Sequence, residues 1–330
     1  MLEATIQEAS TLKRLLDAVK ELVTDGNFEC NDEGIHLQAM DNSHVALVSA
    51  SLRSEGFSNF RCDRPITLGV NLASLTKVIK CAKDDDEVRL TAADSADNLQ
   101  LVYNSKASDR VAQYDVKLMD IDQETLTIPD TDYDATVSMS SAEFARLCRD
   151  LGALGESVAI EVTKEGVRFS CEGDAANGTV LLKADSSGGR HSGGSSSKMK
   201  IKKEEDEDAR MDEDASEDDG GEKEDEDEDD EEETSKKRKR SKASSEKAPK
   251  GKAKKARKTE EEGDVQGVQL VMSQHVALTF SIKYLLNFAK SANLCNRVTL
   301  SLSNDVPLMV QYDFGQGVIK YFLAPKLTDS

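Results

Sequence analysis

An internal repeat constrains the fold of this chain more than any other feature. Residues 33–39 (EGIHLQA) resemble residues 165–171 (EGVRFSC), 132 positions later. Residues 72–80 (LASLTKVIK) match residues 282–290 (IKYLLNFAK), at an offset of 210 positions. A unit that recurs in this way is one domain present twice. The offset grows by 78 positions, which predicts an insertion inside the second copy.

The predicted insertion, at about residues 186–263, consists of three blocks of biased composition. Ser and Gly dominate residues 186–197, acidic residues dominate 204–233, and Lys and Arg dominate 236–258. Such segments bury too little apolar surface to offset the entropy that a chain loses on ordering. We therefore expect a disordered charged insertion, for which a plain solvated linker is the simplest interpretation.

Each copy carries the same predicted elements. Apolar residues recur with helical spacing at residues 11–23, 70–82, 141–151 and 281–292. Ser140 with Glu143 three residues on predicts a capping box for the third helix. Alternating strands surround the helices, as at residues 88–90 and 298–300. The pattern indicates α+β domains whose antiparallel sheets are covered by helices on one face.

Basic residues occur on all four predicted helices, although the formal net charge of the chain is -20. Outside residues 187–265 the chain has 36 acidic and 23 basic residues, so a positive surface requires cations gathered on one face. The second and fourth helices contain no acidic residue. These helices carry basic residues but no aromatic residues placed to stack on bases, which favours sequence-independent contact with phosphates. For any single helix, an ordinary solvated face explains the basic residues equally well.

Helix width favours several copies if these helices surround duplex DNA. A helix is about 10 Å wide and a duplex roughly 20 Å across, so about nine helices are needed to enclose it. The four predicted helices of one chain are too few. Three copies supply twelve, the smallest multiple of four that leaves room for water, so this hypothesis requires a homotrimer.

Catalysis, a metal cofactor and a membrane span find little support in the sequence. His36, His44, His191 and His275 lack metal-ligand spacing. The acidic run at residues 84–86 is typical of a solvated turn, because no nucleophile, base or phosphate loop accompanies it. No segment approaches about 18 consecutive apolar residues. We expect no enzyme activity, no cofactor and no membrane partner.

Five segments carry a family resemblance that covers nearly all of the chain outside the insertion. They are GIHLQAMDNSHVALVSASLRSEGF (34–57), RCDRPITLGVNLASLTKVIKCA (61–82), KLMDIDQETLTIP (117–129), EFARLCRDL (143–151) and YFLAPK (321–326). The sequence resembles the eukaryotic DNA sliding clamps, the proliferating cell nuclear antigen family. The resemblance implies two duplicated clamp domains per chain in a ring-shaped homotrimer, with helices on the inner face and antiparallel sheets outside.

The resemblance also implies a domain organisation and a set of partners. It divides the chain into a clamp domain at 1–117, an interdomain connector at 118–134 and an interrupted clamp domain at 135–330. The implied ring encircles duplex DNA, tethers replicative DNA polymerases and recruits replication and repair proteins that carry a short clamp-binding peptide. An ATP-dependent clamp loader opens and closes such a ring, which has no catalytic activity itself.

Individual residues are assigned by the same resemblance. The implied DNA-binding residues are Lys13, Arg14, Lys20, Lys77, Lys80, Arg110, Arg149 and Lys290. The implied partner-binding groove consists of Met40, His44, Val45, Leu47, Leu126, Ile128, Pro129, Tyr133, Pro307, Phe322, Ala324, Pro325 and Lys326. The implied subunit interface pairs residues 110–117 with residues 177–183. Lys164 occupies the ubiquitin-acceptor position, which links the family to translesion synthesis.

The insertion leaves a rival function open. Its acidic block at 204–233 is typical of an interaction tail that attracts histones, and the two domains would then merely support it. Its basic runs at 236–240 and 254–258 are similar to a bipartite nuclear import signal. We therefore expect a nuclear protein under either interpretation.

Overall fold

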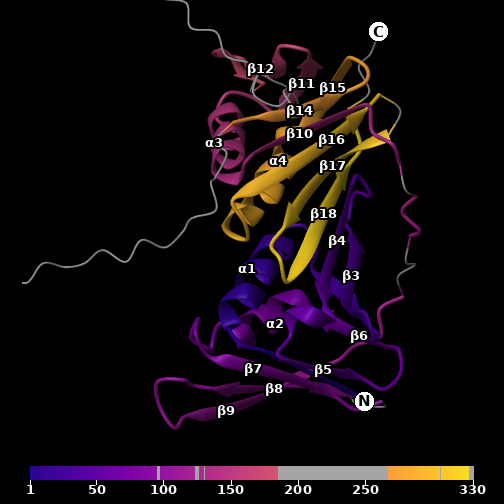
Figure 1. Ribbon diagram of the computed structural model, residues 1–330, viewed down its shortest axis with the longest axis vertical. Helices are drawn as coiled ribbons and strands as arrows, with labels where there is room; N and C mark the ends of the chain where they lie inside the picture. Colours follow the sequence, from indigo (N-terminus) through magenta and orange to yellow (C-terminus); the bar gives the residue numbers. More distant parts are fainter. Residues whose placement is uncertain (95–96, 123–125, 130, 185–266, 305, 327–330) are drawn as a thin grey trace, which may run out of the picture. The chain divides into compact units, whose positions relative to one another are not determined.

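The computed structural model describes most of both copies (Figure 1). The described residues are 1–94, 97–122, 126–129, 131–184, 267–304 and 306–326. All of them belong to one compact unit, Met1–Arg190 together with Asp264–Ser330. The predicted insertion at 186–263, with its acidic and basic blocks, lies outside the described residues.

The two copies have matching orders of strands and helices. The first contains β1 (Leu2–Ile6), α1 (Ala9–Val19), β2 (Asp25–Cys30), β3 (Gly34–Met40), β4 (Ala46–Arg53), η1 (Ser54–Gly56), β5 (Asn59–Cys62), β6 (Ile66–Asn71), α2 (Leu72–Ile79), β7 (Glu87–Ala92), β8 (Asn98–Asn104) and β9 (Val111–Lys117). The second contains β10 (Ala135–Ser140), α3 (Ser141–Gly152), β11 (Ser157–Thr163), β12 (Gly166–Glu172), β13 (Asn177–Lys183), β14 (Gln269–Met272), β15 (Val276–Ser281), α4 (Ile282–Phe288), the 3₁₀ helix η2 (Ala289–Asn293), β16 (Arg297–Ser303), β17 (Val306–Asp313) and β18 (Gly317–Leu323).

The strands form three sheets, and every named strand pair is antiparallel, as predicted. The orders are β5-β1-β7-β8-β9, β14-β10-β16-β17-β18-β4-β3-β2-β6 and β13-β12-β11-β15. In the nine-stranded sheet β18 of the second copy pairs with β4 of the first, for example at Tyr321 and Val48. The two copies therefore share one continuous sheet.

The helices cover the sheets and also contact one another across the two copies. Helix α1 packs against α2 and against η2, while α3 packs against α4 and η2. The apolar stripe of α1 is buried, with Leu12, Leu15, Leu16 and Val19 at most 7% exposed. This burial is what the helical spacing of apolar residues predicts.

Three details of the predicted helices are wrong. The second helix begins at Leu72 because Asn71 ends β6 and caps the helix, its side chain accepting a hydrogen bond from the Ser74 N–H. The fourth α-helix ends at Phe288 and continues as the 3₁₀ helix η2. Ser140 is the N-cap of α3, but its side chain makes no capping hydrogen bond, so the predicted capping box is not formed.

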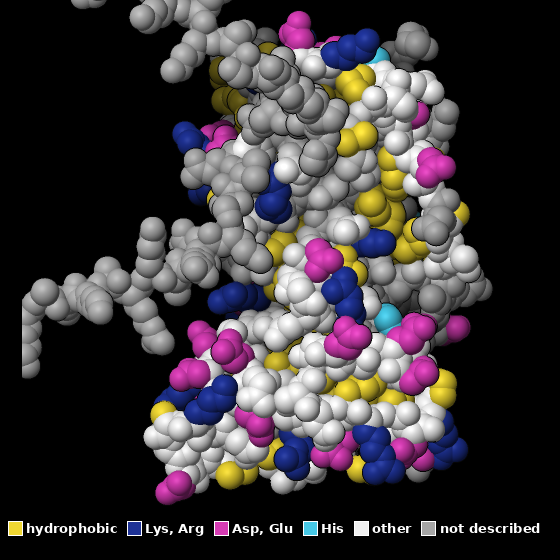
Figure 2. All heavy atoms as spheres, in the orientation of Figure 1, with side chains coloured by type: hydrophobic (Ala, Val, Ile, Leu, Met, Phe, Trp, Pro, Cys, Tyr) yellow, Lys and Arg dark blue, Asp and Glu magenta, His cyan; other side chains and the backbone are white. Residues whose placement is uncertain are grey.

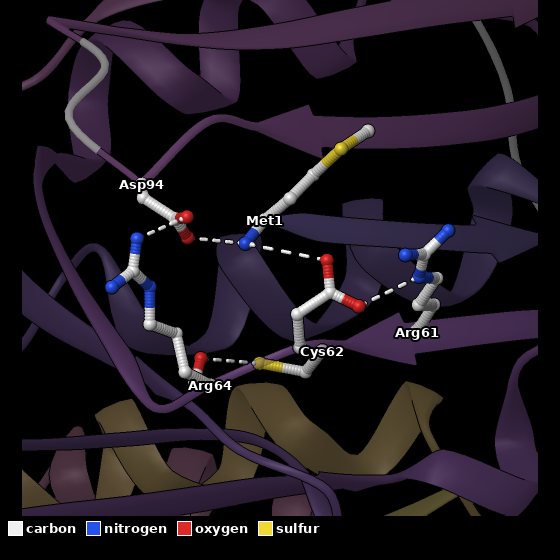
Figure 3. A network of polar contacts seen from close by, with 6 residues as sticks. Met1, Arg61, Cys62, Arg64 and Asp94 are labelled. Atoms are coloured by element: carbon white, nitrogen blue, oxygen red, sulfur yellow. Dashed lines mark hydrogen bonds and ion pairs between the residues drawn. The ribbon is translucent and has the colours of Figure 1, made fainter.

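Ion pairs hold the start of β1 against neighbouring turns (Figure 3). The amino group of Met1 contacts Asp94 and lies 3.8 Å from a carboxylate oxygen of Asp63. Asp94 also pairs with Arg64, and Arg61 Nε lies 2.7 Å from Asp63. The Arg64 guanidinium and the Met1 ammonium hold the pKa of Asp94 well below its usual range.

Among the described residues no helix is both long enough and apolar enough to cross a bilayer.

Candidate functional site

A cavity of about 310 Å³ lies between the β3–β4 loop, residues 126–129, 131 and 133, the start of β17 and the end of β18. Figure 1 shows the segment between β9 and β10 along the right-hand side of the molecule. Figure 2, in the same orientation, shows hydrophobic side chains exposed on that side. The predicted groove residues that line the cavity are Met40, His44, Val45, Leu47, Leu126, Ile128, Pro129, Tyr133, Pro307, Phe322 and Ala324. Sequence reasoning missed four further lining residues, Ala46, Thr127, Thr131 and Val306.

Asp41 shapes the loop that forms one wall of the cavity. Its Oδ1 accepts hydrogen bonds from the backbone N–H groups of Val45 at 2.9 Å and Ala46 at 2.7 Å. Its Oδ2 accepts from the Ser43 N–H at 3.0 Å and from the Tyr284 hydroxyl at 2.9 Å. An aspartate that bonds backbone groups ahead of it is typical of such turns, so the Asp41-Asn42-Ser43 sequence was a signal for this role.

The pKa of Asp41 reflects two opposing effects. Burial alone raises it, while the hydrogen bonds from Ala46, Ser43, Tyr284 and Val45 lower it by more, so the net shift is downward. Asp41 is therefore a carboxylate at neutral pH. A charged acceptor strengthens each of the bonds that fix the loop.

The same loop brings His44 and Met40 together at the cavity wall. His44 has a φ of 55°, in the left-handed region that non-glycine residues rarely adopt. This turn places His44 Nδ1 3.0 Å from Met40 Sδ. Met40 is therefore a surface residue of the cavity rather than a core methionine.

The segment that follows β9 runs along β6 and β2 before it reaches the cavity. The Met119 N–H donates to the Gly69 carbonyl at 2.9 Å, and Asn27 Nδ2 donates to the Ile121 carbonyl at 3.0 Å. A Cβ atom at Gly69 would lie 2.0 Å from the Met119 carbonyl oxygen. Only glycine allows this close approach of the two backbones.

Pro325 and Lys326 do not line the cavity, although the resemblance placed them in the groove. The Ala324 N–H donates to the Val45 carbonyl of the first copy at 3.1 Å, and the chain then turns back toward strands of its own copy. There the Lys326 N–H donates to the Thr279 carbonyl at 2.7 Å, and its ammonium donates to Ser157 Oγ at 2.5 Å. These bonds direct Lys326 toward β11 and β15.

Seven of the eight predicted DNA-binding cations lie on or directly after helices. Lys13 and Arg14 are on α1, Lys77 is on α2, Arg149 is on α3 and Lys290 is on η2. Lys20 and Lys80 are the C-cap residues of α1 and α2. Arg110 is not near a helix in the sequence, because it directly precedes β9. Its carbonyl accepts a hydrogen bond from the Ser105 N–H at 3.1 Å, in the loop between β8 and β9.

Acidic residues neutralise several of these cations. Asp17 Oδ1 lies 2.6 Å from Lys20 Nζ and 3.3 Å from Lys80 Nζ. Hydrogen bonding to Asp17 raises the pKa of Lys20. Glu21 Oε2 lies 3.4 Å from Lys290 Nζ, which joins the turn after α1 in the first copy to η2 in the second.

Other predicted cations differ in how they are paired. Lys13 Nζ lies 2.7 Å from Asp84 Oδ1. Arg14, Lys77, Arg110 and Arg149 form no ion pair within the part of the chain that the structure describes. These four exposed cations have no internal carboxylate partner there and are therefore available to an external anion.

Lys164 lies in the two-residue turn between β11 and β12 and is exposed. No group of three or more potential metal ligands occurs among the described residues. The described chain thus offers an apolar cavity lined by most of the predicted groove residues, helices that carry most of the predicted cations, and an exposed lysine.

Comparisons with known proteins assign the chain to a family. The model of the proliferating cell nuclear antigen N-terminal domain matches residues 1–126. The model of the C-terminal domain matches residues 127–205 and 242–327, and the gap between these ranges lies within the predicted insertion. The proliferating cell nuclear antigen of Chaetomium thermophilum is 42% identical over 330 residues, which cover 100% of this chain and 99% of the relative. The chain therefore belongs to the proliferating cell nuclear antigen family.

Proposed function

We propose that this chain works through three surfaces: a helix surface that faces DNA, an apolar cavity that takes client peptides, and two strand edges that join the subunits. The family gives the activity: the chain is a DNA sliding clamp, which tethers DNA polymerases and is placed on DNA by a clamp loader. Our proposal assigns particular residues to each of the three surfaces.

The observation that carries the proposal is the pairing of β18 with β4 inside one chain. The equivalents of these strands in the other half of the repeat are β9 and β13, and both are edge strands of their sheets. An open sheet edge is a template for pairing with another chain. Pairing β9 of one subunit with β13 of the next repeats the internal junction and extends it around a ring.

The internal junction also predicts a register for the subunit interface. Tyr321 lies opposite Val48, and the repeat relates these residues to Tyr114 and Gly178. Tyr114 of one subunit is therefore expected opposite Gly178 of its neighbour. The same register places Val111, whose residue surface is 66% exposed, opposite Leu181. Burial of these apolar side chains stabilises the interface.

The helix surface suits a clamp that moves along DNA. Lys77, Arg14 and Arg149, which have no ion-pair partner among the described residues, offer their charge to phosphates, while Lys20 and Lys80 share the carboxylate of Asp17. Contacts of this kind neutralise phosphates without reading base sequence. A topological link with weak contacts permits sliding, whereas tight binding at one position would prevent it.

The apolar cavity suits a short peptide that inserts apolar or aromatic anchors. Its walls come from the β3–β4 loop, the connector residues and the C-terminal end of β18. Leu126 and Ile128 are 42% and 37% exposed there. Exposed apolar residues that flank a cavity are a typical docking site for such anchors.

We further propose that the protein acts in the nucleus, has no catalytic activity of its own and accepts ubiquitin at Lys164. The exposed turn that carries Lys164 supports access by a modifying enzyme. Replacement of Lys164 by Arg should abolish attachment of ubiquitin at this position, as read by mass spectrometry of the modified protein. The rival function, histone binding, depends on the acidic block at 204–233, which lies outside the described residues.

The decisive experiment combines solution mass with retention on DNA. Light scattering of the full chain should give three times the chain mass of 36.0 kDa. Loaded protein should stay on a closed circular plasmid and leave it after the plasmid is cut. A monomer in solution, or equal retention on circular and linear DNA, would overturn the proposal.

A further inference from the structure

Two amide side chains on the nine-stranded sheet hold the connector by its backbone. Asn27 on β2 and Gln38 on β3 are directly opposite in the antiparallel register, so their side chains lie on the same face. Asn27 Nδ2 donates to the Ile121 carbonyl at 3.0 Å. Gln38 Nε2 donates to the Leu126 carbonyl at 2.8 Å. The Leu126 N–H donates in return to Gln38 Oε1 at 2.5 Å.

The paired bonds of Gln38 to Leu126 resemble one step of a strand ladder made by a side chain. An amide has one donor group and one acceptor group that match the N–H and carbonyl of a single residue. Such a pair fixes both the position and the orientation of Leu126. Among the described connector residues 126–129 and 131–133, no other backbone group is hydrogen-bonded to the sheet.

Beyond Leu126 the connector borders two neighbouring cavities. The first is the cavity of about 310 Å³, and the second has a volume of about 400 Å³. Ile128, Pro129, Thr131 and Tyr133 line both of them. A segment that borders two cavities has few packing contacts to hold it, so its position depends on the point where it is anchored.

We propose that Gln38 is a positioning residue for the partner-binding cavity, which it does not itself line, and that Asn27 anchors the connector upstream. This role rests on the proposed function of the cavity. Gln38 fixes Leu126 at the cavity edge, so that the wall formed by residues 126–129 is in place before a peptide arrives. A wall that is already ordered loses less conformational entropy when the peptide binds, so binding is more favourable.

The test compares three variants of the full-length trimer. Gln38→Met keeps the length of the side chain and removes both bonds. Gln38→Glu keeps the acceptor for the Leu126 N–H and places a negative charge beside the Leu126 carbonyl. Ser49→Ala is the matched control, because Ser49 is the next residue in this cross-strand row and makes no hydrogen bond to the connector within the described chain.

Two measurements are needed. Hydrogen exchange of the Leu126 amide in the free protein reports the anchor, and we expect it to be about tenfold faster in Gln38→Met than in wild type. Calorimetry with a synthetic peptide that contains a glutamine and aromatic end residues reports the cavity. We expect Gln38→Met to bind about three- to tenfold more weakly, with a less favourable entropy. Gln38→Glu should fall between, and Ser49→Ala should match wild type.

The outcomes separate this inference from the proposed function. Faster exchange together with unchanged peptide affinity in both Gln38 variants would overturn the positioning role while leaving the cavity as the peptide site. Unchanged exchange at Leu126 would show that Gln38 is no anchor. If the wild-type protein fails to bind the peptide, the proposed cavity function and the role of Gln38 within it both fall, whatever the exchange result.

Discussion

The Tyr284 hydroxyl donates a hydrogen bond to Asp41 Oδ2 at 2.9 Å, across 243 positions of the chain. Tyr284 lies on α4 of the second copy, and Asp41 orders the cavity loop of the first. This bond therefore joins the loop at the apolar cavity to a helix in the other half of the chain.

Replacement of Tyr284 by Phe should destabilise the protein by about 1–2 kcal/mol, because a charged acceptor loses its donor. Urea unfolding monitored by circular dichroism measures the loss. Tyr312→Phe is the matched control, since the Tyr312 hydroxyl is buried without a hydrogen-bond partner among the described residues. Its removal should be neutral or slightly stabilising. Equal losses in both variants would contradict a specific role for the Asp41 bond.

Asp41 predicts a dependence of stability on pH. Burial raises its pKa, but its hydrogen bonds lower it further, so the folded value lies below the unfolded value of about 3.9. A lowered pKa stabilises the fold fully above the unfolded pKa, and this contribution is lost as pH falls through the folded pKa. The difference in unfolding free energy between wild type and Asp41→Asn should be constant from about pH 8 to 5 and shrink below about pH 4. A difference that grows on acidification would contradict this assignment.

Local patterns predicted the elements, whereas contacts between the copies were not predictable from them. The repeat and the spacing of Leu12, Leu15 and Val19 indicated duplicated α+β domains and the buried face of α1. The bond between Asp41 and Tyr284 depends on how β18 pairs with β4, which no local pattern encodes. The acidic residue Asp17 was visible on α1, but its position between two lysines of different helices required the packed structure.

Asp17 should lower the affinity of the clamp for DNA. Its carboxylate occupies Lys20 and Lys80, so a phosphate must compete with it for both ammonium groups. We expect Asp17→Asn to bind a short duplex several-fold more tightly, with a steeper dependence on salt concentration. Fluorescence anisotropy across a salt series measures both quantities. Asp313→Asn, which removes a carboxylate paired with Arg53 outside the helices, is the control for net charge alone. An equal gain in both variants would leave Asp17 without a specific role.

Val111 should be essential for the subunit interface. It is 66% exposed on the edge strand β9, and the internal β18–β4 junction places it opposite Leu181 of the neighbouring subunit. Val111→Lys would bury a charge against an apolar side chain, so we expect the trimer to dissociate at concentrations where wild type remains intact. Light scattering over a dilution series measures this shift. Val271→Lys is the matched control, because Val271 is 74% exposed on the edge strand β14. Dissociation of the control instead would move the interface to β14.

Ile128 should contribute directly to peptide binding. It is 37% exposed and lines the cavity between Leu126 and Pro129, where an apolar anchor of a peptide would contact it. Ile128→Ala should weaken binding of a clamp-binding peptide by about 1–3 kcal/mol, since a buried anchor contact is lost. Calorimetry gives this value, and unfolding should be nearly unchanged because the side chain is partly exposed. Met119→Ala is the control, because Met119 is 45% exposed in the same connector but does not line the cavity. Weaker binding in Ile128→Ala alone would locate the peptide in this cavity, whereas equal affinities in both variants would place it elsewhere on the clamp.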